Sequence, residues 1–376
     1  MTSVRPLAGM KVLEIGHSIA APYAGMILGE LGADVVKLEN PGAGDYARGW
    51  GPPFSDGAST IFQAMNRGKR AITADLKDAT QRDRVKRLIL QEVDVVLHNL
   101  KPGALEKLGL GAAALLAEKP GLICCNLGAF GARGPMKDHP GYDPLMQAFG
   151  GLMSMLGEDG RPPVRVSVSI MDIGTGMWAA LGILAAHVER LRTDKGGVVD
   201  ASLFETSCAW MSVPIASYLA SGKLPGRAGS GVQEIVPYQA YPTSDGYIMV
   251  AAGNDNLFRK LCLALERKDL ADDPRFAENA GRVAHRPELI GQLSGEFARD
   301  SVAAWTAKLE AVGVPSGPVQ TLDQVVAHPQ TAAMGVLQTS PDGTLRTMGL
   351  PLSFDGERAP YRSKAPTLGA DNDLLS

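Results

Sequence analysis

Asp172 is the residue whose chemical type and setting most favour catalysis in this sequence. It lies in the apolar stretch Val168–Met177, where the pattern predicts the start of a long apolar helix. The backbone amides at a helix N-terminus would keep this carboxylate ionised and would stabilise an oxyanion formed beside it. An ionised carboxylate is a weak nucleophile, but it suffices against an activated acyl group such as a thioester. The alternative is that Asp172 only caps the helix, which is the commoner role for a single aspartate at such a position.

The turn Gly16–Pro22 follows the first predicted strand, where a dinucleotide-binding fold has its glycine-rich phosphate loop. The glycines of that loop are missing here, and His17, Ser18 and Ile19 put side chains where the phosphates need space. Glu39 ends the second predicted strand, where such folds place the acid that binds ribose, but an exposed strand-end carboxylate explains it equally well. An NAD-dependent oxidoreductase is therefore disfavoured.

Metal sites and structural disulfides are not expected. The four cysteines show no CxxC pair and no Cys/His spacing suited to a tetrahedral metal site, and the six histidines are scattered. The sequence also lacks a P-loop, a GxSxG nucleophile elbow and an HExxH motif. With 37 Lys and Arg against 40 Asp and Glu, the net charge is -3. This balance disfavours nucleic acid or an anionic membrane as the main partner and favours a small molecule.

The composition is that of a folded globular protein. The chain has 376 residues, of which 45% are hydrophobic and 20% charged, and this length predicts two domains. The most apolar segment, Met177–Ala186, is shorter than the roughly 20 residues of a membrane helix. We therefore predict that it is a buried core helix. The N-terminus shows no signal-peptide pattern, so we expect a reducing, cytoplasmic setting without a membrane.

Short runs rich in Val, Ile and Leu alternate with helical patterns over residues 1–130. The predicted strands are Lys11–Gly16, Asp34–Glu39, Ala71–Asp75, Asp94–Asn99 and Leu122–Leu127. The predicted helices between them are Ala21–Leu31, Thr80–Glu92 and Gly103–Lys119. This alternation predicts an α/β fold with a Rossmann-like large domain, in which helices cover both faces of a parallel sheet.

The rest of the chain predicts the end of this domain and a second, smaller one. The further elements expected are helices over Asp143–Met155, residues 172–192 and residues 204–220, and strands over Gly197–Leu203, Val236–Pro242 and Gly246–Ala251. Residues 221–235 begin with a stretch dense in Gly and Pro, which indicates a linker or glycine-rich loop. We predict a large domain over residues 1–220, to which residues 330–376 return, and a small α+β domain over residues 236–329.

A series of short motifs resembles the class III coenzyme A transferases, also known as the carnitine-dehydratase and bile-acid-inducible family. The motifs are Val12–Gly16, Ala20–Pro22, Leu31–Glu39, Asn66–Arg70, Asp75–Lys77, His98–Gly103, Gly141–Asp143, Asp172–Gly176, Gly196–Leu203 and Gly313–Pro318. Each motif is weak alone, but the series covers nearly the whole chain and its order and spacing are specific. The family includes relatives such as formyl-CoA transferase and α-methylacyl-CoA racemase.

The resemblance implies that the protein transfers coenzyme A (CoA) from an acyl-CoA thioester to a carboxylic acid, with Asp172 as the nucleophile. The carboxylate would attack the thioester, giving a mixed anhydride and a CoA thiolate. The thiolate would then attack the aspartyl carbonyl, leaving an aspartyl-CoA thioester for the acceptor acid. CoA is a substrate in this scheme, and no permanently bound cofactor or metal is implied, because a thiolate leaves without protonation.

The resemblance also implies where CoA binds, mainly on the Rossmann-like domain. The positions that match its contacts are Ala20, Asn40, Ala74, Asp75, Leu76, Lys77, Asn99, Leu100, Lys101 and Lys107, together with Tyr142. Asn40 stands where relatives often have arginine. For the lysines, the alternative is ordinary solvation at the surface.

Two other functions remain alternatives at this point. The racemases of the family use a His/Asp pair to move an α-proton, and the histidine position holds Tyr142 here, a poor base at neutral pH. Transferase activity is therefore favoured over racemase activity. A non-catalytic CoA-binding protein is the other alternative.

The resemblance extends to assembly and to one loop. The family forms an interlocked homodimer in which each chain makes a ring threaded by the other. The stretch Gly226–Gly231 resembles, in location, a loop that closes over the intermediate in some relatives, although an interdomain linker needs the same small residues. The acyl donor and the acceptor acid are left open.

Overall fold

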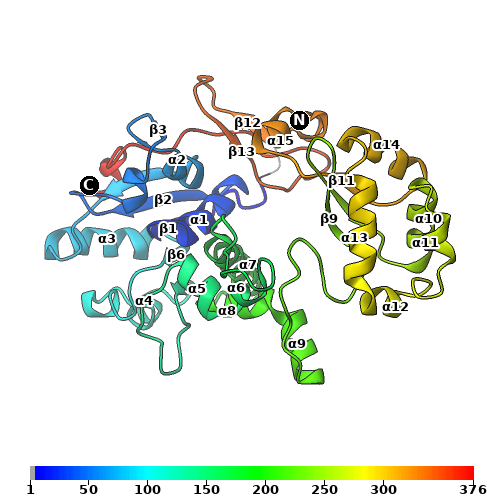
Figure 1. The fold of residues 1–376 in the computed structure, drawn as a ribbon. Helices are drawn as coiled ribbons and strands as arrows, with labels where there is room; N and C mark the ends of the chain where they lie inside the picture. Colours follow the sequence, from blue (N-terminus) through cyan, green and yellow to red (C-terminus); the bar gives the residue numbers. More distant parts are fainter. Residues whose placement is uncertain (1–4) are drawn as a thin grey trace. The chain divides into compact units, whose positions relative to one another are not determined.

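The computed structural model describes residues 5–376, which form two compact units (Figure 1). The first unit contains the chain up to residue 150 together with residues 166–212 and 328–376. The second unit contains residues 151–165 and 213–327. The division expected from the sequence differs in three places, because it assigns residues 151–165 and 213–220 to the large domain and residues 328–329 to the small one.

A six-stranded parallel sheet forms the centre of the first unit. In spatial order its strands are β5 (Arg70–Thr73), β2 (Asp34–Glu39), β1 (Lys11–Ile15), β6 (Val95–His98), β7 (Ile123–Gly128) and β8 (Gly197–Ser202). Each strand expected from the sequence is present. The central parallel sheet predicted from the alternating pattern is therefore confirmed.

Helices cover both faces of this sheet because successive strand residues point to opposite sides. Val12 packs in the hydrophobic layer shared with α1 (Ala20–Glu30) and α7 (Ile170–Thr193). Leu13 packs in the opposite layer with α3 (Ala79–Glu92) and α4 (Ala112–Glu118). A parallel sheet of short apolar strands buried on both faces is the result.

Two predicted helices are interrupted at glycines. The segment expected to be one helix over Gly103–Lys119 is a short 3-10 helix, η2 (Glu106–Leu108), followed by α4, because Gly109 has a left-handed φ of 69°. The segment expected over Asp143–Met155 is divided into α5 (Asp143–Phe149) and α6 (Leu152–Met155) by Gly151, with φ 89°. A left-handed residue ends a helix, and glycine takes that conformation at little cost.

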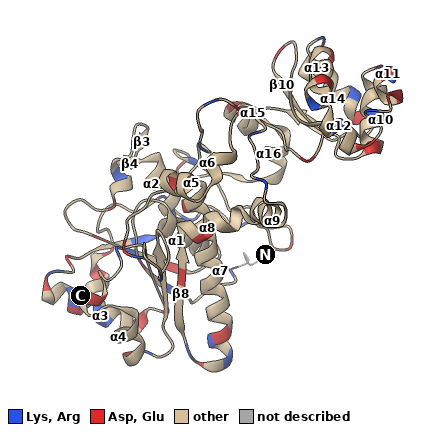
Figure 2. Ribbon diagram, turned by 60° about the horizontal axis from the view of Figure 1, so that its bottom comes forward, with Lys and Arg blue, Asp and Glu red and all other residues tan. Residues whose placement is uncertain are grey.

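Helix α7 is buried on one face only, so the prediction of a buried core helix over Met177–Ala186 is wrong for its outer face. Ala179, Ala180 and Ile183 are buried, whereas Met177 and Leu181 are exposed. In the described part of the chain, α7 is the one helix long and apolar enough to span a membrane by length and hydropathy. Its charged side chains lie mainly at one end (Figure 2). The same properties occur in core helices of water-soluble proteins, and α7 packs on α1 and the sheet.

The rest of the first unit consists of short elements. Near the N-terminal strands they are η1 (Tyr46–Gly49), β3 (Phe54–Ser55), β4 (Ala58–Ser59) and α2 (Thr60–Asn66), and after β8 comes α8 (Leu203–Trp210). The C-terminal part adds α16 (Pro329–Met334), β12 (Leu337–Thr339), β13 (Arg346–Met348) and η3 (Asn372–Leu375). The chain end returns to β5, where the Asp371 carboxylate accepts the Ala71 N–H at 2.8 Å.

The second unit combines a small sheet with helices. The predicted hairpin is present as antiparallel β9 (Tyr238–Pro242) and β10 (Tyr247–Ala251), to which β11 (Ser316–Pro318) adds a third strand. Its helices are α6, described above, and α9 (Ser212–Ser221), α10 (Asp255–Ala264), α11 (Lys268–Asp272), α12 (Asn279–Ala284), α13 (Arg286–Phe297), α14 (Val302–Ala311) and α15 (Leu322–Ala327). A separate hydrophobic core, including Tyr241, Phe258 and Phe297, holds this unit together.

Candidate active site

The carboxyl edge of the parallel sheet contains a topological switch point between β1 and β6. The strand order runs one way from β1 to β2 and β5 and the other way from β6 to β7 and β8. The loops that leave adjacent strands there diverge to opposite faces, which opens a crevice where α/β proteins bind ligands. The sequence-predicted CoA contacts after β1, β2, β5 and β6 all lie at this edge.

Asn99 joins the two sides of the switch point. Its side-chain Oδ1 accepts the His17 N–H at 3.0 Å, and its Nδ2 donates to the His17 carbonyl at 2.9 Å. The Asn99 amide is therefore engaged with the protein backbone, so its part in CoA binding would be to shape the crevice. The sequence predicted Asn99 as a CoA contact but did not predict its hydrogen bonds to the His17 backbone.

The turn after β1 contains a residue with a positive φ angle, and a buried carboxylate fixes this turn by a hydrogen bond. Ser18 has φ 68°, a left-handed conformation that is strained for a residue with a side chain. Its N–H donates to Asp45 Oδ1 at 2.9 Å, and Asp45 is buried. Strained backbone of this kind is found at functional sites, where the surrounding structure fixes it.

A buried charge network supports this turn. Lys37 is fully buried, and its Nζ lies 2.9 Å from Glu14 Oε1, 2.9 Å from Asp45 Oδ2 and 2.8 Å from the Gly16 carbonyl oxygen. Lys69 is the second cation, with Nζ 2.6 Å from Glu14 Oε2. Although burial alone would raise the pKa of Glu14, the two ammonium groups outweigh it and lower that pKa. Burial lowers the pKa of Lys69 to about 8, so this ammonium group is still mostly charged at neutral pH.

Sequence reasoning missed the role of this network. Glu14, Lys37 and Lys69 lie in motifs that carried the family resemblance, but no function was assigned to them. A usable signal was present, since a charged residue inside an apolar, fully buried strand needs a partner of opposite charge. Glu14 in β1 and Lys37 in the neighbouring β2 meet this condition.

Glu39 is not the exposed strand-end carboxylate proposed as one explanation from the sequence. It is buried, and Arg48 binds it with two hydrogen bonds, Nε to Oε2 at 2.8 Å and Nη2 to Oε1 at 2.6 Å. Glu39 Oε2 also accepts the Asp45 N–H at 2.8 Å. Because these contacts occupy both oxygens, Glu39 is not available for a ribose, which agrees with the rejection of a dinucleotide site.

Asp172 lies beside the switch point, in the first turn of α7. One turn later, Gly176 packs so closely on α1 that an added Cβ would lie 2.7 Å from the Ala20 carbonyl oxygen. Asp172 shares the face of α7 with Gly176, because residues four apart lie one above the other. Helices α1 and α7 both run antiparallel to the strands, so their N-termini meet at the carboxyl edge. This arrangement places Asp172 next to the turn after β1.

The electrostatic setting of Asp172 differs from the expected one. Ser169, not Asp172, is the N-cap of α7, and the Met171 N–H donates to the buried Asp143 carboxylate at 2.7 Å. The half-buried Asp172 carboxylate has no hydrogen bond among those of the described residues. Burial raises its pKa to about 7, and the Asp143 carboxylate contributes to this rise. The expectation that helix amides keep Asp172 fully ionised is therefore wrong, because Asp143 takes up that amide.

The other predicted CoA contacts fall into two groups. Ala20 and Ala74 are buried in the two hydrophobic layers, so a contact there would use the backbone. The positions at least partly open to solvent are Asn40, Asp75, Leu76, Lys77, Leu100, Lys101, Lys107 and Tyr142. The Lys77 N–H donates to Asp75 Oδ1 at 2.9 Å, which fixes the turn after β5. The lysine ammonium groups at this edge can therefore approach an anionic ligand.

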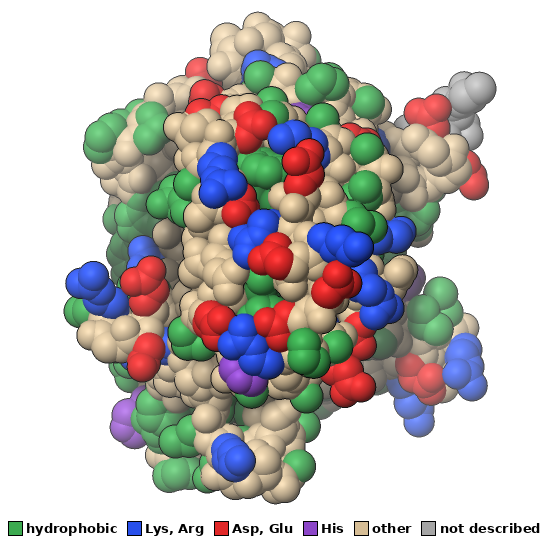
Figure 3. Space-filling model, turned by 45° about the vertical axis from the view of Figure 1, so that its right-hand side comes forward, with side chains coloured by type: hydrophobic (Ala, Val, Ile, Leu, Met, Phe, Trp, Pro, Cys, Tyr) green, Lys and Arg blue, Asp and Glu red, His purple; other side chains and the backbone are tan. Residues whose placement is uncertain are grey.

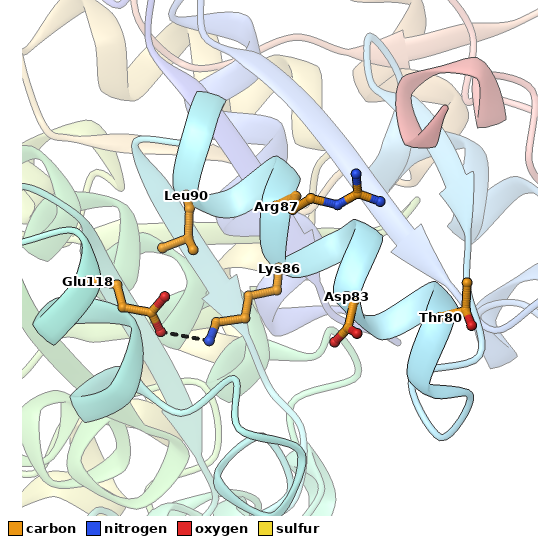
Figure 4. A pocket seen from close by; sticks show the side chains of 6 residues that line it. All are labelled: Thr80, Asp83, Lys86, Arg87, Leu90 and Glu118. Atoms are coloured by element: carbon orange, nitrogen blue, oxygen red, sulfur yellow. Dashed lines mark ion pairs between the residues drawn. The ribbon is translucent and has the colours of Figure 1, made fainter.

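A surface depression on α3 and α4 contains none of these residues. It has a volume of about 540 Å³ and is lined by Thr80, Asp83, Lys86, Arg87, Leu90 and Glu118, with an ion pair of 2.6 Å between Lys86 and Glu118 (Figure 4). The charges of its lining have both signs, which gives an anionic ligand little preference for it.

The surface charges are also mixed elsewhere, since the face drawn in Figure 3 shows basic and acidic side chains interspersed. Residues 5–376 contain no group of three or more His, Cys, Asp or Glu side chains arranged for a metal ion.

A parallel sheet with a switch point, and beside it a partly buried aspartate whose pKa is raised, is typical of the active site of an α/β enzyme. Comparison with known proteins gives the family. The model of CoA-transferase family III matches residues 7–372, and the chain belongs to this family. It is a CoA-transferase, which transfers CoA from an acyl-CoA thioester to a carboxylic acid.

Three similar proteins illustrate the match. The succinate–glutarate CoA-transferase of Agrobacterium fabrum is 37% identical over 97% of this chain and 93% of its own length. The succinyl-CoA–D-citramalate CoA-transferase of Chloroflexus aurantiacus is 36% identical over 88% of this chain and 82% of its own. The crystal structure of a CAIB/BAIF family protein from Brucella suis aligns with a TM-score of 0.89, 40% identity and 98% coverage of both chains. The transferase interpretation of the sequence is thereby confirmed over the racemase alternative.

Proposed function

We propose that this enzyme transfers CoA from succinyl-CoA to a small aliphatic dicarboxylic acid, with Asp172 as the nucleophile. The observation that carries the mechanism is the desolvated Asp172 carboxylate beside the switch-point crevice. The substrate class is supported by similar proteins whose names give succinate, glutarate and citramalate, all of them aliphatic dicarboxylic acids.

Each residue of the site has a part in this mechanism. The ionised Asp172 attacks the thioester carbonyl, and burial makes its carboxylate more basic and therefore more nucleophilic than one in water. The turn that contains His17 and Ser18 forms the facing wall, held by Asn99 and by the charge network around Lys37. The exposed lysines at the same edge attract the phosphates of CoA.

The proposal is tested by trapping the enzyme-bound intermediate. Incubation with succinyl-CoA and no acceptor, followed by hydroxylamine, should convert Asp172 to a hydroxamate detected by peptide mass spectrometry. Donors crossed with formate, oxalate, succinate, glutarate and an aromatic acid should then give the fastest transfer with the aliphatic dicarboxylic acids. Labelling of Glu39 or Asp143 in place of Asp172 would refute the mechanism, and preference for a monocarboxylic acid would refute the substrate class.

Lys77→Ala and Lys107→Ala are expected to raise KM for the acyl-CoA donor up to about fivefold each, because a solvated ion pair contributes about 0.2–1 kcal/mol. The value of kcat should stay nearly unchanged, since the contact exists equally in the ground state and the transition state. Steady-state kinetics at low and high salt checks both points. Lys195→Ala is the matched control, because this exposed lysine follows the C-terminal end of α7. An unchanged KM in both variants would remove these lysines from the CoA site.

We also propose that the enzyme is a cytoplasmic homodimer. Helices α7 and α8 expose a set of large apolar side chains: Met177, Trp178, Leu181, Val188, Leu191 and Trp210. Apolar patches of this kind are commonly covered by a partner. Cysteines 124, 125, 208 and 262 are free, as expected in a reducing compartment. Sedimentation equilibrium of the purified enzyme should give twice the chain mass, and a monomer at micromolar concentration would contradict the dimer.

A further inference from the structure

Asp143 is a buried carboxylate with both oxygens occupied by N–H donors. Its Oδ2 accepts the Met171 N–H at 2.7 Å, and its Oδ1 accepts Gln147 Nε2 at 2.6 Å. Only 2% of Asp143 is exposed, and Gln147 is fully buried. Both oxygens of the Asp143 carboxyl group are therefore engaged by donors of the protein, one on α7 and one on α5.

Gln147 fixes this carboxylate to the segment that leads into α7. Its Oε1 accepts the Val166 N–H at 2.8 Å, and its Nε2 donates to the Val166 carbonyl at 3.1 Å as well as to Asp143. Because the amide of Gln147 satisfies one donor and one acceptor of Val166, it cannot rotate without losing both contacts. Helix α5 therefore contacts the chain at Val166, before the N-cap Ser169, and at Met171, in the first turn of α7.

We propose that Asp143 is a positioning residue, which holds the first turn of α7 and places a fixed negative charge beside Asp172. This inference rests on the proposed function, in which Asp172 attacks the thioester. The two carboxylates have opposite environments. Asp143 accepts two N–H donors, whereas Asp172 accepts none among the described residues, and burial, with a contribution from the Asp143 charge, raises the pKa of Asp172 to about 7. When two neighbouring carboxyl groups have such different environments, one has a structural role and the other is the reactive group.

The elements packed against α7 are α1, α5, α8, β7 and β8. The titratable side chains on them are Tyr23, Glu30, Asp143, Glu205, Cys208, Cys124, Cys125 and Asp200. Among these groups, only the charge of Asp143 acts on Asp172 within the described part of the chain. Removal of this one charge should therefore change the titration of Asp172.

The test is the pH dependence of kcat/KM for succinyl-CoA. In the wild-type enzyme the activity should fall about tenfold per pH unit below a midpoint near 7, because protonated Asp172 is not a nucleophile. In Asp143→Asn the midpoint should move down by about one pH unit, since a neighbouring like charge is removed. The carboxamide of this variant has a single acceptor oxygen for the two N–H donors, so kcat should also fall. Asp143→Ser removes the same charge by a different side chain.

Two control variants distinguish the effect of the Asp143 charge from the effect of its hydrogen bonds. Gln147→Leu loses the anchor but keeps the Asp143 charge, so kcat should fall while the midpoint does not move to lower pH. Asp138→Asn removes an exposed charge before α5 and should change neither value. Folding of each variant is checked by thermal unfolding.

The outcomes distinguish this inference from the proposed function. If Asp172→Ala keeps transfer activity, the proposed function fails. If Asp172→Ala is inactive and a folded Asp143→Asn or Asp143→Ser keeps the wild-type midpoint, only the role of Asp143 fails. Should neither variant fold, a wild-type midpoint near 4 overturns the inference, because no neighbouring charge then acts on Asp172.

Discussion

Replacing Asp172 with alanine is expected to lower kcat for CoA transfer on the order of 10⁶-fold, as found when a covalent nucleophile is removed. The loss should be this large because the acceptor acid and the thioester never react directly in the proposed path. Every turnover passes through a bond to the Asp172 carboxyl group. The hydroxamate formed at Asp172 in the trapping experiment should disappear in the same variant.

The dissociation constant for CoA itself should be unchanged in Asp172→Ala. Asp172 lies beside the switch-point crevice, whereas the exposed lysines that follow β5 and β6 attract the nucleotide. Isothermal titration of the variant with CoA measures this constant independently of turnover. Asp172→Asn provides a second comparison, because it keeps the size of the side chain and removes only its nucleophilic charge. Transfer within tenfold of the wild type in both variants would eliminate Asp172 as the nucleophile.

The sheet could be predicted from the sequence because its central strands are short apolar runs buried on both faces. Residues 34–39 show this well, since the predicted and observed strand have the same ends. The helices were predicted less accurately where glycine takes a left-handed conformation, as at Gly109 and Gly151. A glycine inside a helical pattern is compatible with either a helix or a break, and tertiary packing decides between them.

The place of Asp172 could be predicted, but its electrostatics could not. The apolar stretch before α7 located the helix start within two residues. The pKa of Asp172 depends on Asp143, which is 29 positions earlier in the chain and reaches it only through the packing of α5. Contacts between carboxylates so far apart in sequence leave no local pattern. Glu39 and Arg48 are only nine positions apart, but their pairing also leaves no local pattern, because it depends on how the loop after β2 folds back on the strand.

Lys37→Met is expected to lower the free energy of unfolding of the first unit by about 3–5 kcal/mol, the cost of removing one partner from a buried ion pair. Methionine fills the space of the lysine stem but leaves Asp45 without its cation. Urea unfolding monitored by circular dichroism measures the change. The matched control is Lys77→Met, an exposed lysine in the same unit, which should change stability by no more than about 0.5 kcal/mol.

The double variant Lys37→Met/Asp45→Asn tests whether charge balance is the cause of this loss. In the wild type, Glu14, Asp45 and Glu39 face Lys37, Lys69 and Arg48, so three negative charges meet three positive ones. Removing Lys37 alone leaves one anion uncompensated, and removing the Asp45 charge as well restores the balance. The carboxamide oxygen of an asparagine can still accept the Ser18 N–H, which keeps the turn in place. We therefore expect the double variant to recover about 1–3 kcal/mol relative to Lys37→Met. If it is instead less stable than Lys37→Met, packing around the lysine stem, and not the unpaired charge, determines the stability of this site.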